Sequence, residues 1–219
     1  MRDYIFFDLD GTLTDSQDGI KESLRITLDH YGIQKTDEEL IPFLGPALWD
    51  SLPKYAGFKP EDVAPAVEIF RKHYFEKGIY NNRVYEGIVE LLEKLKANGK
   101  HIVLATGKPE VQAKVVLNHF DLMKYFEFVG GSTLDPSRSK KGQVINYAIQ
   151  NLNLSESEKA RIIMVGDRDN DINGAHENGL ECIAVLYGYG NQKEFENAGA
   201  DYICETVEDL GELLLHRSL

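Results

Sequence analysis

The sequence predicts an α/β protein whose core is a doubly wound parallel sheet, with a helical unit inserted near its start. Short apolar runs, several hydrophobic on both faces, alternate with amphipathic helical patterns, which is typical of βαβ units. One interval, residues 16–80, interrupts this alternation because it contains helical patterns and no convincing strand. We therefore expect residues 1–15 and 81–219 to form the core domain and residues 16–80 to form a helical cap domain.

Six apolar runs are the expected strands of the core. They cover about residues 3–8, 101–105, 127–130, 161–165, 181–186 and 201–204. Runs without polar alternation fit strands that are covered by helices on both faces of a sheet.

Apolar residues at helical spacing separate these runs. In the core, three such sets predict helices, and the first should end at Asn98-Gly99 because that pair is a C-terminal cap signal. The sets are Ile88, Leu91, Leu92 and Leu95; Val111, Val115 and Leu122, which belong to the second helix and its exit; and Val144, Ile145, Ala148, Ile149 and Leu152. In the inserted interval, the helix faces are Ile20, Leu24, Leu28 and Tyr31, and Val63, Val67, Phe70 and Tyr74. An insertion that leaves from the end of the first strand should cover the ligand site of the sheet.

Composition limits the possible partners. The 24 Lys and Arg residues against 36 Asp and Glu residues give a net charge of −12, which argues against a nucleic-acid-binding surface. No apolar run is long enough to span a membrane, and no leader sequence is apparent. Cys182 and Cys204 are too few for a disulfide framework and are expected to be buried and reduced. We expect a cytoplasmic protein with neither nucleic-acid nor membrane partners.

Chemically active residue types follow several of the predicted strands. The stretch IFFDLDGTLTDS ends an apolar strand with two carboxylates, which are costly to bury without partners. Since the carboxyl ends of parallel strands meet at one edge, polar groups that follow other strands should lie nearby. These are Asp8, Asp10, Thr106, Gly107, Asp167 and Asp171, with Lys140 and Lys141 at the start of the helix before residues 161–165.

Four carboxylates in one crevice would repel each other, and a divalent cation resolves that repulsion. An all-oxygen ligand set with few protein ligands suits Mg²⁺, which commonly also binds a phosphate oxygen. Asp8 is then placed to attack phosphorus, while the Thr106 hydroxyl, nearby backbone N–H groups and Lys141 offset the developing negative charge. Asp10 can protonate the leaving alcohol and later deprotonate water. The pattern predicts hydrolysis of a small phosphate ester through an aspartyl-phosphate intermediate.

The ordered set of DLDGTLTDS, an apolar run ending in Thr106, a lysine and GDRDND resembles the four motifs of the haloacid dehalogenase superfamily of phosphohydrolases. The resemblance spans essentially the whole chain. It implies that Asp8 is the nucleophile and Asp10 the general acid/base, whose backbone carbonyl also binds Mg²⁺. Thr106, Gly107 and Lys141 would hold the phosphoryl group. Asp167 would bind Mg²⁺ directly, and Asp171 would orient the metal or its waters. The inserted interval is similar to the C1-type cap of that family, above a Rossmann-like core.

Within that superfamily the chain looks most like the phosphoglycolate phosphatase and 5′-nucleotidase group. The supporting stretches are FLGPALWDSL at 43–52, NNRVYEGIVELL at 81–92 and GGSTLDPSRSKKGQVI at 130–145. The lysine stands in SRSKKGQVI rather than before a proline, so Lys140 is an alternative to Lys141. A sugar phosphomutase and a non-enzymatic phospho-acceptor module are the alternative functions. Arg138 and Arg168 are candidates to meet a second charged group on the substrate.

Overall fold

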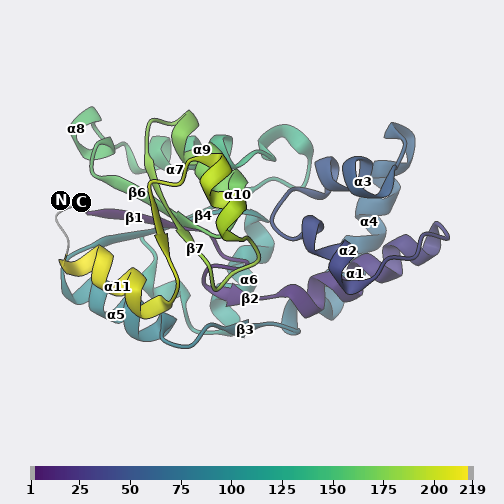
Figure 1. Ribbon diagram of the computed structural model, residues 1–219, viewed down its shortest axis with the longest axis horizontal. Helices are drawn as coiled ribbons and strands as arrows, with labels where there is room; N and C mark the ends of the chain where they lie inside the picture. The colour runs from purple at the N-terminus through teal and green to yellow at the C-terminus, as the bar shows by residue number, and fades with distance from the viewer. Residues whose placement is uncertain (1–2, 217–219) are drawn as a thin grey trace.

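The computed structural model describes residues 3–216, and its core is one six-stranded sheet. All strand pairings in this sheet are parallel, and the spatial order is β5-β4-β1-β6-β7-β8 (Figure 1). The strands are β1 (Tyr4–Phe7), β4 (His101–Pro109), β5 (Phe128–Ser132), β6 (Ile162–Gly166), β7 (Glu181–Val185) and β8 (Tyr202–Cys204).

Strand β1 lies at the centre of the sheet, between β4 and β6. Phe7 is in register with Leu104 on one side and Val165 on the other, so the carboxyl ends of the three strands lie at the same level. The strand order reverses beside β1, which is where ligands bind in open α/β sheets.

Helices cover both faces of the sheet. One face packs against α5 (Ile88–Ala97), α6 (Glu110–His119) and α11 (Val207–His216); the other packs against α7 (Lys141–Leu152), α9 (Asp169–Glu177) and α10 (Gln192–Ala198). Side chains of β1 alternate between the two apolar clusters: Ile5 and Phe7 face one, and Tyr4 and Phe6 face the other. The short helix α8 (Glu156–Lys159) and the 3₁₀ turns Met123–Tyr125 and Pro136–Arg138 lie in connections.

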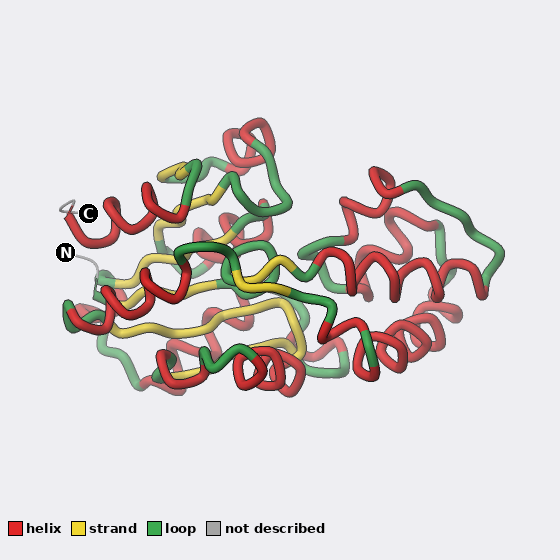
Figure 2. The backbone as a smooth tube through the Cα atoms, turned by 90° about the horizontal axis from the view of Figure 1, so that it is seen from below, coloured by secondary structure: helices red, strands yellow, loops and turns green. Residues whose placement is uncertain are grey.

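Residues 17–80, here called the helical lobe, are all described and contain no strand. The lobe consists of α1 (Gln17–His30), α2 (Asp37–Leu40), α3 (Leu48–Ala56), α4 (Pro60–Glu76) and the 3₁₀ turns Ile41–Phe43 and Gly78–Tyr80. It extends to the right of the sheet in Figure 1, at the opposite end from both chain termini, and Figure 2 shows it as helices and loops alone. Helix α1 packs along α4 through the apolar faces expected from the sequence.

Two short strands join the lobe to the core. Strands β2 (Thr14–Asp15) and β3 (Arg83–Val84) pair antiparallel, so that the chain enters and leaves the lobe side by side. The prediction missed this pair, because strands of two residues have no periodicity to detect.

The predicted α/β fold class is confirmed, and each of the six expected runs contains a strand. The largest difference is at β4, which continues four residues beyond the predicted end at Ala105, through an irregularity between Thr106 and Pro109. The division into domains at residues 15/16 and 80/81 stays a prediction.

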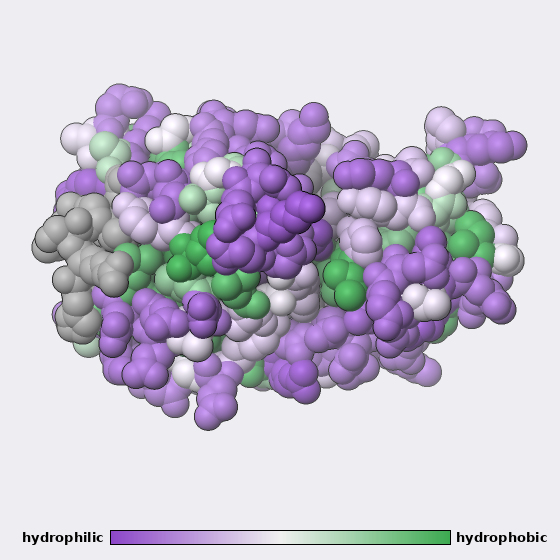
Figure 3. Space-filling view, viewed as in Figure 1, coloured by the Kyte–Doolittle hydropathy of each residue, from purple (hydrophilic) through white to green (hydrophobic). Residues whose placement is uncertain are grey.

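The surface is mostly polar. Hydrophilic residues predominate on the face shown in Figure 3, and the exposed large hydrophobic side chains are scattered along the chain, at Ile26, Ile41, Phe75, Tyr80, Val89, Val111 and Leu134. Cys182 and Cys204 are buried, and neither forms a disulfide. Among the described helices, none combines the length and the apolar character that crossing a membrane requires.

Candidate active site

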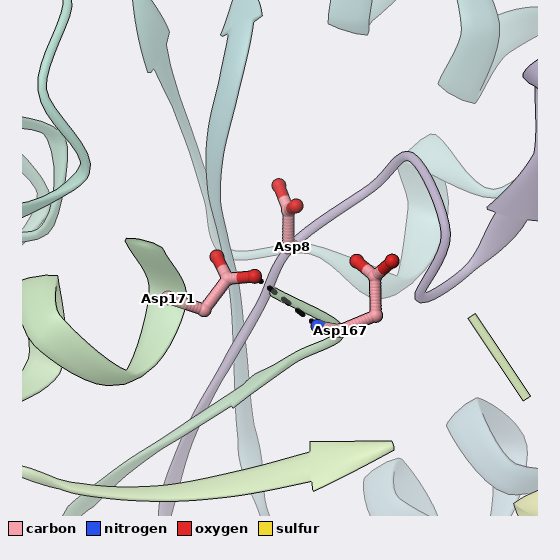
Figure 4. A group of neighbouring side chains, drawn as sticks. All are labelled: Asp8, Asp167 and Asp171. Atoms are coloured by element: carbon pink, nitrogen blue, oxygen red, sulfur yellow. Dashed lines mark hydrogen bonds between the residues drawn. The ribbon is translucent and has the colours of Figure 1, made fainter. Parts of the chain in front are cut away.

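Three carboxylates from separate parts of the chain meet at the carboxyl edge of the sheet. Asp8 directly follows β1, Asp167 follows β6, and Asp171 lies in the first turn of α9. One oxygen from each lies within 4.8 Å of the others, and all three residues are buried (Figure 4). The backbone N–H groups of Asp167 and Arg168 each donate to Asp171 Oδ2 at 3.1 Å, which fixes this carboxylate at the start of α9.

Burial of like charges shifts the titration of these acids. Burial, together with the carboxylates of Asp171 and Asp8, raises the pKa of Asp167 well above its usual value. Burial also raises the pKa of Asp171 to about 6, although Lys141 opposes the shift. An all-oxygen set of three buried carboxylates fits a hard divalent cation. Two of the oxygens, Asp8 Oδ1 and Asp171 Oδ1, are buried and receive no well-aligned hydrogen bond, although Lys141 is within ion-pair distance.

Lys141, rather than Lys140, points into this cluster. Its Nζ lies 2.8 Å from Asp8 Oδ1 and 2.6 Å from Asp171 Oδ1, and it donates to the carbonyl of Ala105 at 3.2 Å. Burial alone would lower the pKa of Lys141, but the two carboxylates outweigh it and raise the pKa, so the ammonium stays charged. Lys140 is exposed at the N-cap of α7.

Gly11 and Thr12, the last two residues of the DxDGT stretch, pack directly against Asp167. Gly11 has φ +83°, and a Cβ there would lie 2.1 Å from Asp167 Oδ2. The Thr12 hydroxyl donates to Asp167 Oδ1 at 3.2 Å, and the Tyr189 N–H donates to Asp167 Oδ2 at 2.8 Å. The turn after β1 therefore packs directly on the acid that follows β6.

The Asp10 carboxylate lies outside the three-acid cluster and has a cation of its own. Lys108 Nζ is 2.8 Å from Asp10 Oδ2, and the Ser16 hydroxyl donates to Asp10 Oδ1 at 2.6 Å. Lys108 also donates to the hydroxyl of Tyr74, on α4 of the helical lobe, at 2.6 Å. Burial would lower the pKa of Lys108, but Asp10 and Tyr74 raise it, so this buried lysine is charged. The sequence places Lys108 beside Thr106 and Gly107 at this edge of the sheet, but the sequence reasoning gave it no role.

A cavity of about 100 Å³ opens between the lobe and the sheet edge. Asp8, Asp10, Thr106 and Gly107 line it from the core, together with Lys108. Thr106 is 1% exposed, and its hydroxyl accepts a hydrogen bond from the Lys108 N–H at 3.2 Å. Of the expected catalytic, phosphate-binding and metal-binding residues, four line this cavity and the others belong to the adjoining acid cluster or contact it: Asp8, Asp10, Thr106 and Gly107 in the wall, and Asp167, Asp171 and Lys141 beside it.

Arg138 and Arg168 have other partners. Arg168 donates to Glu194 at 2.8 Å and to the carbonyl of Leu44 in the lobe. Arg138 stacks on the Tyr147 ring at 3.6 Å and donates to the Gly131 carbonyl. Neither arginine is among the described residues that line the cavity.

Comparison with known proteins agrees with this arrangement. The model of the family described as haloacid dehalogenase-like hydrolase matches residues 5–185. A predicted phosphatase from Clostridium acetobutylicum, solved by crystallography, superposes with a TM-score of 0.95 at 42% identity, covering 99% of this chain and all of that one.

Three curated relatives carry different activities in their names. A 5′-nucleotidase of Pseudomonas aeruginosa is 36% identical over 96% of this chain and 94% of its own. The tyrosine-protein kinase PtkA of Mycobacterium tuberculosis is 34% identical over 96% of this chain and 72% of its own. A phosphoglycolate phosphatase of Aquifex aeolicus is 31% identical over 84% of this chain and 85% of its own. The resemblance stated from the motifs is confirmed for the family, and proteins named 5′-nucleotidase and phosphoglycolate phosphatase are among the relatives.

Proposed function

Because this chain belongs to the haloacid dehalogenase-like hydrolases and is a phosphatase of that family, we propose that it hydrolyses a small phosphate monoester with the help of Mg²⁺, through an aspartyl-phosphate on Asp8. Phosphoglycolate and 5′-nucleotides are the proposed substrates. The observation that carries the proposal is the position of Asp8, which lines the cavity and at the same time belongs to the buried acid cluster.

The proposed steps use groups in the cavity wall. Lys141 Nζ, 2.8 Å from Asp8 Oδ1, orients the Asp8 side chain so that a carboxylate oxygen can attack phosphorus. Thr106 and the N–H groups of the irregular segment after it supply hydrogen bonds to phosphoryl oxygens. Asp10 gives a proton to the leaving oxygen and then takes one from the water that hydrolyses the aspartyl-phosphate.

Asp8, Asp167 and Asp171 would hold the Mg²⁺, with the Asp10 backbone carbonyl as a further ligand. When bound, the cation would neutralise charge on the phosphoryl oxygens and on the crowded carboxylates. The protein's part is to hold these oxygens together, which Thr12 and the backbone N–H groups around Asp167 do through the hydrogen bonds described above.

The test is hydrolysis of p-nitrophenyl phosphate with Mg²⁺ by the Asp8→Asn variant. We expect activity to fall to background while the circular dichroism spectrum is unchanged, because the amide is isosteric but not nucleophilic. Asp29→Asn, the same change at an exposed position of α1, is the matched control and should keep full activity. Substantial turnover by Asp8→Asn would refute the assignment of the nucleophile. Sugar phosphates that are interconverted without release of phosphate would instead identify a mutase.

A further inference from the structure

The wall of the site cavity that faces the leaving group is largely apolar. Apolar side chains of the helical lobe form this wall. They include Phe43 from the segment before α3, Leu48 and Trp49 from α3, and Val67 and Phe70 from α4. A leaving group that occupies this space loses most of its contact with water. Any charge on it would therefore need a free counter-ion inside the cavity.

Both cations in the described lining already have partners. Lys108 is held by Asp10 and Tyr74. Arg71 Nη1 lies 3.1 Å from Glu68 Oε1, and its other terminal nitrogen donates to the Leu134 carbonyl. Its guanidinium also lies 5.7 Å from the Trp49 ring centroid. A second anionic group on the substrate would therefore have to share or displace the partners that each of these cations already has in this structure.

Two neutral polar side chains in the same wall have no partners. Gln112, in the first turn of α6, is 4% exposed, and Ser132, at the end of β5, is 6% exposed. Within residues 3–216, neither the Gln112 amide nor the Ser132 hydroxyl makes a hydrogen bond, and both residues line the cavity. The polar atoms of these two side chains are not among the fully buried atoms that lack a partner, so they reach the cavity and are open to hydrogen bonds from a ligand there.

The backbone brings these two residues to one place. Ser132 is in register with Pro109, which directly precedes α6. The neighbouring Gly131 permits this approach, because a Cβ there would lie 2.6 Å from the Glu110 N–H nitrogen. The end of β5 and the first turn of α6 therefore form a polar corner beside the apolar wall that the lobe contributes.

We propose that Gln112 and Ser132 are a specificity site that hydrogen-bonds a neutral leaving group. An amide offers both a donor and an acceptor, and a hydroxyl can act as either. The matching leaving group is uncharged, has an apolar face that can pack on the wall formed by the lobe, and carries hydrogen-bond donors and acceptors of its own. A nucleoside has these properties, whereas the carboxylate of glycolate would be buried without a free cation. The inference rests on the proposed phosphatase function and selects nucleoside 5′-monophosphates over phosphoglycolate.

Steady-state kinetics with Mg²⁺ on four esters tests the proposal. These are uridine 5′-monophosphate, adenosine 5′-monophosphate, phosphoglycolate and p-nitrophenyl phosphate. We expect kcat/KM for the better nucleotide to exceed that for phosphoglycolate by about tenfold or more, since buried hydrogen-bonding groups discriminate strongly. Gln112→Leu and Ser132→Ala should each lower kcat/KM for that nucleotide by about five- to tenfold, and change it less than about twofold for p-nitrophenyl phosphate. Asn118→Leu, an exposed amide on the same helix, is the control and should change neither.

Three outcomes would overturn the inference. The first is a preference for phosphoglycolate, and the second is an equal loss on every ester in both variants, which a purely structural role would produce. The third is no change in either variant. In each of these cases the proposed function survives as long as Asp8→Asn abolishes hydrolysis of p-nitrophenyl phosphate. Failure of the parent protein to hydrolyse any of the four esters would instead refute the proposed function, and the inference with it.

Discussion

Replacing Lys108 by Met removes one member of a buried ion pair and keeps the apolar length of the side chain. The Lys108 side chain is 4% exposed and that of Asp10 is 12% exposed, at a separation of 2.8 Å. Breaking such a pair leaves an uncompensated buried charge, so we expect the free energy of unfolding to fall by about 3–5 kcal/mol. Tyr74→Phe removes only one hydrogen bond to the ammonium and should cost about 1.5–3 kcal/mol.

A double-mutant cycle separates the ion pair from general damage to the core. Asp10→Asn should also destabilise the protein, because it leaves the Lys108 ammonium without its carboxylate. The combination of Asp10→Asn with Lys108→Met should cost little more than either change alone, which gives a coupling energy of about 3 kcal/mol. The assay is urea unfolding followed by circular dichroism in the absence of divalent cations. Lys114→Met is the control, because its ion pair with Glu110 is 48% exposed on the lysine side and should cost less than about 1 kcal/mol.

The same variant has a catalytic readout. Without Lys108, the Asp10 carboxylate is no longer held toward the cavity, so we expect Lys108→Met to lower kcat by about tenfold or more with a smaller effect on KM. If Asp10→Asn and Lys108→Met proved additive in stability to within about 0.5 kcal/mol, the two charges would not be coupled. The reasoning from their distance and burial would then be wrong.

Three further predictions concern the acid cluster. Burial raises the pKa of Asp171 to about 6, so protonation of this side chain stabilises the metal-free folded protein. The stabilisation is complete below the pKa of Asp in the unfolded chain and is lost as the pH rises through about 6. Mg²⁺ favours the ionised form, so its increase of Tm in differential scanning fluorimetry should be larger at about pH 7.5 than at about pH 5. Chelation should abolish turnover, and added Mg²⁺ should restore it; an equal Tm shift at both pH values would contradict the cluster assignment. Gly11→Ala should place a methyl group against Asp167 and abolish the Mg²⁺-dependent Tm shift, whereas Gly32→Ala, at another positive-φ glycine with open space around its Cβ position, should retain it.

The sequence was sufficient to predict the parallel sheet and the edge of the sheet at which the site lies. Apolar runs such as IFFD and RIIMV are local features, and carboxylates placed directly after them predict where they meet once the strands are parallel. Asp8, Asp167 and Asp171 could be brought together by this reasoning because each needs only its own strand.

The partners of the charged and polar side chains could not be predicted from the sequence. Lys108 is buried only because Asp10 and Tyr74, from the first strand's end and from the lobe, surround it. Gln112 lies on a helix where a polar residue is most simply interpreted as solvent-exposed, and the cavity that it faces exists only when the lobe is in place. Arg168 follows Asp167 in the motif, yet it binds Glu194 and Leu44 rather than facing the cavity. In each case the deciding neighbour is distant in sequence, so no local pattern records it.

The two lysines explain how two carboxylates one residue apart can serve different purposes. Asp8 shares Lys141 with Asp171, so three buried acids face one ammonium, and the excess negative charge matches a divalent cation. Asp10 is the one carboxylate described as paired with Lys108, so its negative charge is neutralised without the metal and its side chain stays directed toward the cavity. A single lysine shared by both acids would draw Asp10 into the metal cluster and leave no group to protonate the leaving oxygen. Separate counter-ions therefore hold the two carboxylates of the DxD pair in different places, with Asp8 in the acid cluster and Asp10 directed toward the cavity, where it can exchange a proton with the leaving oxygen and with water.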